Sequence, residues 1–139
     1  MILLDTNVIS EITRADGNRS VFAWVETKLE TDLFLCAPVV AEMAFGAQLF
    51  LLRTGSSKHM KVLETVVGTS YRGRILPMTL DASRVAGKFK AVREAAGRPV
   101  ASADMYIAGI AAANNATLAT RNVRDFEGLD LKLINPFEA

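Results

Sequence analysis

The opening residues constrain the fold more than any other part of the sequence. The apolar run 2–4 leads directly into Asp5, and apolar residues at helical spacing, Val8, Ile9 and Ile12, follow at once. A short run that is apolar throughout is typical of a strand buried on both faces of a parallel sheet, and such sheets bind ligands just beyond the carboxyl ends of their strands. The opening therefore predicts a buried strand that ends in a carboxylate at a ligand-binding edge.

Four more segments are predicted to be strands, and segments of helical spacing separate all of them but the last two, which a polar turn joins. The four predicted strands cover residues 33–37, 75–78, 117–120 and 131–134. Strands that alternate with helices indicate a mainly parallel sheet with helices on both faces. Pro77 has no N–H to donate to a ladder, so we place the run 75–78 at a sheet edge or at a strand end. The expected fold is therefore α/β.

Two of the helical segments carry an unusual amount of apolar surface. Residues 39–53 are apolar on nearly every side except at Glu42 and Gln48. The next segment carries an apolar stripe made of Met60, Leu63, Val67 and Tyr71. A helix that is apolar all round has more than one neighbour, and apolar surface left over on a monomer marks a partner interface. We therefore expect residues 39–52 and this stripe to form part of such an interface.

Polar residues mark the expected starts of the other helices. Ser20 is expected to cap one helix, and Thr79 or Asp81 another. Ser102 is expected to cap a helix over 103–114, which is apolar all round and therefore central. The helix that follows Asp81 has an expected exposed side of basic residues, made of Arg84, Lys88, Lys90 and Arg93.

Composition excludes several kinds of site. With 139 residues, half of them apolar, the chain is expected to form one domain over 1–139. A single cysteine, Cys36, expected in the core, and a single histidine, His59, expected at the surface, exclude a disulfide framework and a Cys/His zinc site. This composition fits a reducing cytoplasm, and polar interruptions of the longest apolar stretch predict no membrane span. The net charge of +1 argues neither for nor against a nucleic-acid partner.

Four acids are expected at the same edge of the sheet. Asp5 follows the first strand and Asp125 follows the fourth. Glu42 lies in the helix after the second strand, and Asp104 lies at a helix start. Carboxylates brought together without counter-charge repel one another and raise their pKa values, so such a cluster usually marks a cation site. Oxygen ligands alone favour Mg²⁺ or Mn²⁺, which can activate a water for attack at phosphorus, so the acids point to phosphodiester hydrolysis.

Each acid also has a purely structural interpretation. Asp5 could cap the first helix, Asp104 could favour a helix start, and Asp125 could be an ordinary turn residue. Glu42 is harder to explain in this way, because a charge on an otherwise apolar helix needs a partner. The prediction of a metal site therefore rests on the joint placement of the four acids.

The segments that carry these acids resemble those of a known family. Residues 2–8, 39–42, 102–108 and 119–126 together resemble PIN-domain ribonucleases, and specifically the VapC-like toxins of bacterial toxin–antitoxin pairs. The resemblance spans the whole chain. It implies a mainly parallel five-stranded PIN-like sheet flanked by helices on both faces, dependence on Mg²⁺ or Mn²⁺, and cleavage of RNA. It also implies a homodimer held by a cognate antitoxin that carries a DNA-binding domain, with higher toxin–antitoxin assemblies.

By the same resemblance, Asp5, Glu42 and Asp104 match the three principal metal-binding acids. Many family members carry an acid where this chain has Asn122, so Asp125 is expected to be the fourth catalytic and metal-binding acid. Asn122 offers a carbonyl oxygen but no charge, and it stays a second candidate for this place. The residues expected to support the acids, to contact the substrate or simply to cap the first helix are Thr6, Asn7, Thr120, Arg121, Asn122 and Arg124.

The predicted function is a Mg²⁺- or Mn²⁺-dependent endoribonuclease that acts as the toxin of a toxin–antitoxin pair. The ion would activate a water and stabilise the developing charge. Basic residues expected around the acids, where they would attract the RNA backbone, are Arg72, Arg74, Arg121 and Arg124. The alternative is a catalytically weak regulatory module that keeps the fold and acts through an antitoxin–repressor complex. The intact set of acids favours the enzyme.

Overall fold

A five-stranded parallel sheet forms the centre of the protein. The computed structural model describes residues Met1–Ala139, and the strand order is β3-β2-β1-β4-β5, with every neighbouring pair parallel. The strands are β1 (Ile2–Leu4), β2 (Leu33–Cys36), β3 (Ile75–Leu76), β4 (Thr117–Ala119) and β5 (Lys132–Ile134). The predicted sheet is confirmed, and so is the edge position of the run before Pro77. Strand β3 ends at Leu76 because Pro77 cannot donate the next ladder hydrogen bond.

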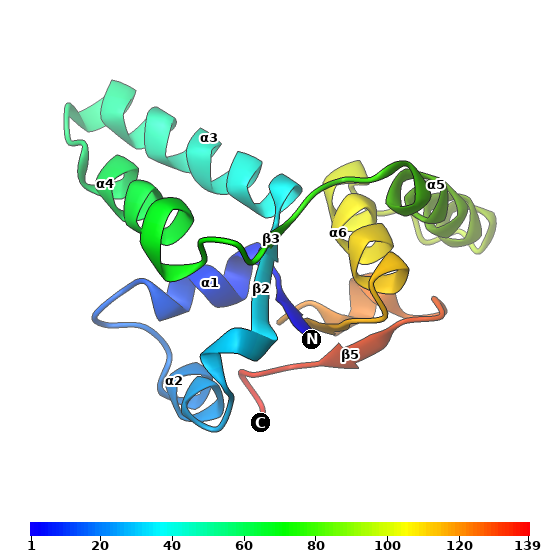
Figure 1. Ribbon diagram of the computed structural model, residues 1–139. Helices are drawn as coiled ribbons and strands as arrows, with labels where there is room; N and C mark the ends of the chain where they lie inside the picture. The colour runs from blue at the N-terminus through cyan, green and yellow to red at the C-terminus, as the bar shows by residue number, and fades with distance from the viewer.

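Helices cover both faces of this sheet (Figure 1). They are α1 (Thr6–Ile12), α2 (Arg19–Glu26), α3 (Ala37–Thr54), α4 (Lys58–Thr65), α5 (Leu80–Ala95) and α6 (Ser102–Ala113). The chain moves outward from β1 through β2 to β3, and then returns across the sheet to β4. Because crossovers between parallel strands are right-handed, the helices of the outward path and those of the return path lie on opposite faces. Figure 1 shows α5 and α6 packed together on the far side of the sheet from α1, α2 and α4.

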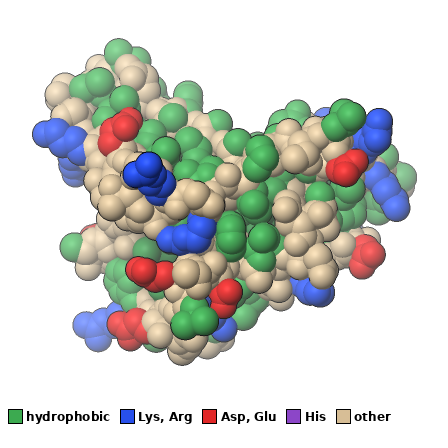
Figure 2. Space-filling model, viewed as in Figure 1, with side chains coloured by type: hydrophobic (Ala, Val, Ile, Leu, Met, Phe, Trp, Pro, Cys, Tyr) green, Lys and Arg blue, Asp and Glu red, His purple; other side chains and the backbone are tan.

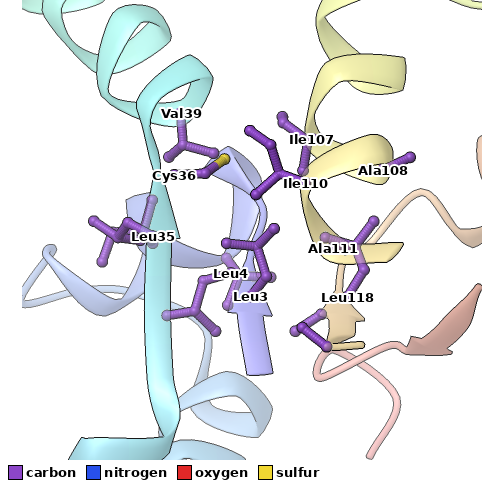
Figure 3. Packing of buried hydrophobic residues seen from close by; sticks show 14 of the residues in the cluster. Leu3, Leu4, Leu35, Cys36, Val39, Ile107, Ala108, Ile110, Ala111 and Leu118 are labelled. Atoms are coloured by element: carbon purple, nitrogen blue, oxygen red, sulfur yellow. The ribbon is translucent and has the colours of Figure 1, made fainter. Parts of the chain in front are cut away.

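Helix α6 is central, as predicted. Ile107, Ile110 and Ala111 are completely buried, and Figure 3 shows Ile107 and Ile110 reaching toward β1, where Leu3 and Leu4 are also completely buried. Burying apolar side chains of this size contributes roughly 1.5–3 kcal/mol each. The sheet on one side and α5 on the other thus cover most of the apolar surface of α6, while Tyr106 stays exposed.

A glycine sets the distance between α5 and α6. A Cβ atom on Gly109 of α6 would lie 2.5 Å from the carbonyl oxygen of Ala82 and 2.8 Å from the amide nitrogen of Ala86, both in α5. Contacts this short with backbone atoms cannot be relieved by rotating a side chain. The two helix backbones consequently lie closer together than any residue with a Cβ atom at position 109 would allow.

Two of the predicted helix caps are wrong. Helix α2 is capped by Asn18, whose side chain accepts from an amide in the first turn at 3.2 Å, and Ser20 lies inside the helix. Helix α6 has no side-chain cap, because the hydroxyl of Ser102 instead accepts a hydrogen bond from Lys90 at 3.0 Å. Thr79 caps α5, as one of the two predicted residues for that place.

The predicted stripe after α3 turns inward instead of outward. Helix α4 is followed by a turn of π-helix (Val66–Ser70), in which the amide of Tyr71 donates to the carbonyl of Val66 at 2.9 Å. This wider turn places Val66, in the place predicted for Val67, on the buried face with Leu63 and Tyr71. The stripe is thus part of the core, and the prediction that it forms partner surface is wrong.

Helix α3 does expose large apolar side chains, as predicted for that helix. Phe45 is 69% exposed and Leu52 is 74% exposed. The rest of the chain therefore leaves part of the apolar surface of α3 uncovered. None of the helices is both long and apolar enough to cross a membrane.

Candidate active site

The four predicted acids lie at the carboxyl edge of the sheet. Asp5 directly follows β1, the central strand, and Glu42 lies in the second turn of α3, which follows β2. Asp104 lies in the first turn of α6, and Asp125 lies in a short 3-10 helix, η3 (Val123–Phe126), after β4. All three of the other acids raise the pKa of Asp104, so the structure brings each of them close enough to repel the Asp104 carboxylate.

Asp5 is the most buried of these acids, with only 4% of its surface exposed. One carboxylate oxygen accepts from the amide of Thr6 at 2.7 Å, and the other accepts from the hydroxyl of Thr120 at 2.7 Å and the side chain of Asn7 at 3.3 Å. Burial raises the pKa of Asp5, and the hydrogen bonds from Thr120 and Thr6 partly oppose that rise. These donors hold the carboxylate in one orientation.

The same hydrogen bonds connect the loop after β4 to the first helix. Thr120 is completely buried, and its hydroxyl also accepts from the amide of Asn122 at 3.1 Å. The side-chain oxygen of Asn7 accepts from the amide of Arg121 at 3.1 Å. Of the residues predicted to support the acids, all but Arg124 belong to one connected network around Asp5, Arg121 and Asn122 through their backbone amides.

Thr6 joins the first two acids. Its amide donates to Asp5, and its hydroxyl donates to a carboxylate oxygen of Glu42. Glu42 was predicted to need a partner because it is a charge on an apolar helix, and Thr6 is that partner. The contact between α1 and α3 thereby fixes the position of Glu42 relative to Asp5.

Asp104 carries the clearest electrostatic signature of the cluster. Its pKa is raised to about 6, first by burial and then by Asp5, Asp125 and Glu42, and no hydrogen bond or positive charge offsets these effects. A carboxylate in this environment is poorly compensated when it is ionised, and a cation nearby would remove the imbalance. Two neighbouring acids with raised pKa values, Asp5 and Asp104, are also typical of a functional site.

The donor set fits a hard divalent ion that keeps part of its water shell. All four side chains offer oxygen, which favours Mg²⁺ or Mn²⁺. In this arrangement no group of three Asp, Glu, His or Cys side chains is close enough together to hold an ion directly. Mg²⁺ commonly binds through one or two carboxylates and several waters, so the residues present are compatible with it.

The electrostatics of Asp104 lead to a prediction for the metal-free protein. An unfolded Asp titrates near pH 4 and the folded one near pH 6, so the folded state binds more protons and loses stability as the pH rises from about 4 to 6. We expect Asp104→Asn to unfold with a free energy about 1–2 kcal/mol higher than wild type at pH 7.5, after allowance for solvent screening. The gain should vanish near pH 4. Urea unfolding at both pH values, with the exposed Asp130→Asn as control, measures this, and equal stability at pH 7.5 would contradict it.

The two candidates for the fourth acid differ in environment. Asn122 is exposed, and its backbone amide, not its side chain, is bound to the network through Thr120. Asp125 is partly buried, and its charge raises the pKa of Asp104. Of the two, only Asp125 acts electrostatically on the cluster.

Cys36 lies beside the acids at the end of β2. It is completely buried, and burial, together with the charges of Asp5 and Glu42, raises the pKa of its thiol to about 12. The thiol therefore stays protonated at neutral pH, which agrees with the predicted core position and excludes a thiolate nucleophile.

Two of the four arginines predicted around the acids lie elsewhere. Arg74 donates to the backbone carbonyls of Glu30, Leu33 and Ser70, at the amino end of β2 and thus at the opposite edge of the sheet. Arg72 belongs to the same turn before β3. The prediction that these two surround the acids is wrong, because residues that precede a parallel strand lie at its amino end.

The other two arginines lie on the loop after β4. Arg121 is exposed and stacks over the ring of Phe137, 4.8 Å from its centroid, and Arg124 is exposed in η3. Arg121 immediately precedes Asn122, and Arg124 immediately precedes Asp125. Both are therefore on the correct edge of the sheet for a substrate that approaches the acids.

One residue that contacts this loop is not among the predicted site residues. Arg93, predicted on the exposed side of α5, is only 6% exposed and donates to the backbone carbonyls of Arg124 and Glu127, on either side of Asp125. The buried face of α5 consists of Ala82, Ala86, Phe89 and Arg93. Arg93 thus continues the apolar spacing of Ala82, Ala86 and Phe89, and this spacing is the signal that could have revealed it.

One of the acids, Glu42, borders two hollows of the surface. An open groove of about 790 Å³ between α3 and α6 is lined by Thr6, Glu42, Phe45 and Tyr106, among others. A second hollow of about 340 Å³, between α1, α3 and α4, is also lined by Thr6 and Glu42. Figure 2 shows hydrophobic side chains gathered in the concave region between α3 and the α5–α6 pair. An extended ligand therefore has access to the acids from the α3–α6 side.

Comparisons with known proteins agree with this architecture. Residues 2–131 match the family model described as the PIN domain. The chain is 39% identical to VapC ribonuclease Y4jK of Sinorhizobium fredii over 138 residues and 36% identical to Toxin FitB of Neisseria gonorrhoeae over 139 residues, with 99% of each chain covered.

Solved structures agree with the same assignment. The structure of FitAB bound to the IR36 DNA fragment has a TM-score of 0.86 at 35% identity, covering 99% of this chain and 96% of that one. The crystal structure of FitAcB from Neisseria gonorrhoeae has a TM-score of 0.86 at 34% identity, with both chains covered completely. These matches span nearly the whole chain, from the first strand to the last. The chain therefore belongs to the PIN-domain family, among relatives named as VapC ribonuclease and FitB toxin.

Proposed function

We propose that this protein is a Mg²⁺- or Mn²⁺-dependent endoribonuclease that acts as the toxin of a toxin–antitoxin pair. The observation that carries the proposal is the cluster of four acids at the carboxyl edge, in which burial and the other three acids raise the pKa of Asp104 to about 6. A relative that is 39% identical over nearly the whole chain is named a ribonuclease. The chemistry expected at such a cluster is metal-assisted hydrolysis of a phosphodiester.

Asp5, Glu42, Asp104 and Asp125 would hold the ion. Once bound, it supplies an activated water and stabilises charge that develops on the phosphate oxygens. Thr120 and Thr6 hold the Asp5 carboxylate in a fixed orientation, and Thr6 also fixes Glu42. An orientation fixed before the ligand arrives contributes to catalysis because little reorganisation is needed during the reaction.

RNA is expected to approach along the open groove between α3 and α6. Four carboxylates repel a phosphate backbone, so binding depends on the ion and on nearby cations. Arg121 and Arg124, both exposed on the loop that carries Asp125, are in the right place to contact phosphates. Contacts of this type make affinity fall with salt concentration.

The proposed partners are a cognate antitoxin with a DNA-binding domain and a second copy of this chain. A neighbour at 35% identity is the FitAB complex bound to DNA. The exposed apolar residues of α3, Phe45 and Leu52, are available for one of these interfaces. We place the activity in the cytoplasm, where RNA substrates are found, and in a single domain over 1–139.

A direct test separates the enzyme from a regulatory module. The purified chain is incubated with single-stranded RNA in Mg²⁺, in Mn²⁺ and in EDTA, and it is also expressed in bacteria without an antitoxin. Metal-dependent cleavage and growth arrest are expected. A protein that binds an antitoxin and promoter DNA but neither cleaves RNA nor arrests growth would instead be the regulatory module.

The identity of the fourth acid leads to a further prediction. We expect Asp125→Asn to reduce RNA cleavage more than Asn122→Ala does, because only the first change removes a charge that acts on Asp104. The difference should be roughly 10-fold or more at limiting Mg²⁺, the range found when groups near a metal are removed. Cleavage rates over a Mg²⁺ titration measure it. The opposite ranking would assign the fourth position to Asn122.

A further inference from the structure

Arg93 is a buried cation that no carboxylate neutralises. It lies in the last turn of α5, is 6% exposed, and takes no part in the ion pairs of the protein, which involve Arg14 and Arg98. A buried charge is unfavourable unless hydrogen bonds compensate it. Arg93 meets this requirement with backbone carbonyls alone.

The positions of these carbonyls show what Arg93 holds. Its Nη1 donates to the carbonyl of Glu127 at 2.9 Å and to that of Arg124 at 3.3 Å, and its Nε donates to the carbonyl of Arg98 at 2.9 Å. Arg124 immediately precedes Asp125, and Glu127 follows it by two residues. One guanidinium therefore holds the backbone of η3 on both sides of Asp125.

The residue between these contacts faces the core. Phe126, next to Asp125, is 1% exposed and belongs to the main hydrophobic cluster. With the backbone held by Arg93 and the neighbouring side chain buried, η3 has little freedom to rotate. Asp125 is thereby kept in place after β4, at the carboxyl edge of the sheet.

The same helix also positions Asp104. Helix α5 lies against α6 at the close approach of Gly109 to Ala82 and Ala86, and α6 carries Asp104 in its first turn. Helix α5 itself contains none of the four acids. It nevertheless contacts the elements that carry two of them, α6 through backbone packing and η3 through Arg93.

We propose that Arg93 is a positioning residue of the metal centre. It fixes the η3 backbone so that the Asp125 carboxylate can contribute to binding the ion with Asp104. This inference rests on the proposed function. A planar guanidinium can donate to carbonyls on two sides at once, whereas the ammonium of lysine is a single point with no such fork. The role therefore requires arginine and not simply a positive charge.

The test is a double-mutant cycle on Mn²⁺ binding, measured by calorimetry. Arg93→Met keeps the length and apolar stem of the side chain but removes its donors, and it should weaken Mn²⁺ binding roughly 10-fold or more. In an Asp125→Asn background the same change should have little further effect, because the carboxylate that Arg93 positions is already gone. A purely structural role would instead lower Mn²⁺ affinity equally in both backgrounds, or leave it unchanged.

Arg93→Lys serves as the second variant and allows for poor folding of Arg93→Met. It keeps the charge and should still bind Mn²⁺ more weakly than wild type, because the fork is lost. Wild-type affinity in either folded variant, or equal effects in the two backgrounds, would overturn the role of Arg93 alone. A wild-type protein that binds no Mn²⁺ and cleaves no RNA would overturn the proposed function together with this inference.

Discussion

Asp5→Asn is expected to lower metal-dependent RNA cleavage by roughly 100-fold or more, the largest effect that we expect of any single substitution. Asp5 is the central acid, since it follows the middle strand and is held by Thr6, Asn7 and Thr120. Asparagine has nearly the same shape but no charge, so the ion loses an anionic ligand while the core is preserved. Cleavage rates with Mg²⁺ and Mn²⁺, together with Mn²⁺ affinity, measure the effect.

A matched control makes this result specific. Asp130→Asn removes the same charge from an exposed residue just before β5, at the amino edge of the sheet, and should leave cleavage and Mn²⁺ affinity unchanged. Antitoxin binding should survive in both variants, because neither change alters the fold. If Asp5→Asn protein were folded and cleaved RNA at the wild-type rate, Asp5 would not belong to the metal centre.

Gly109→Ala is expected to destabilise the protein by about 2–3 kcal/mol, a large effect for the addition of a single methyl group. Alanine is intrinsically the better helix former by about 1 kcal/mol, so propensity alone predicts the opposite sign. The new Cβ would lie 2.5 Å from the carbonyl oxygen of Ala82 and would force α5 and α6 apart. Urea unfolding monitored by circular dichroism measures the change.

Gly87→Ala provides the control within the neighbouring helix. Gly87 is exposed in α5, and a Cβ at this position would meet nothing within 4 Å. We therefore expect this change to stabilise the protein by about 0.5–1 kcal/mol. The same substitution should thus have opposite signs on two adjacent helices, and a stabilising Gly109→Ala would show that the helix contact can relax.

The parts of the fold that were predicted correctly are those whose place in the structure follows from the sequence immediately around them. The strands were predictable because buried parallel strands must be apolar on both faces, and the positions of Asp5 and Asp125 followed because both residues come directly after strands. The central position of α6 was predictable because it has no polar side. In each case the sequence close to the residue carries the information.

The errors concern residues whose environment is formed by distant parts of the chain. The sequence of its own helix predicts an exposed Arg93. Two of the carbonyls that accept its hydrogen bonds belong to residues 31 and 34 positions further along the chain. Arg74 likewise binds carbonyls 41 and 44 positions earlier. The π-helical turn that brings Val66 inward in place of Val67 depends on one altered backbone hydrogen bond, which apolar spacing at 3.6 residues per turn does not reveal.

The protonated state of Cys36 affects how this protein responds to oxidants. Peroxide, disulfides and alkylating reagents react with thiolates, and a thiol with a pKa of about 12 supplies almost none at neutral pH. The residue is also completely enclosed, so a reagent cannot reach it without local opening. The acids that raise the cost of ionising this sulfur therefore also keep it from acting as a thiolate ligand beside them.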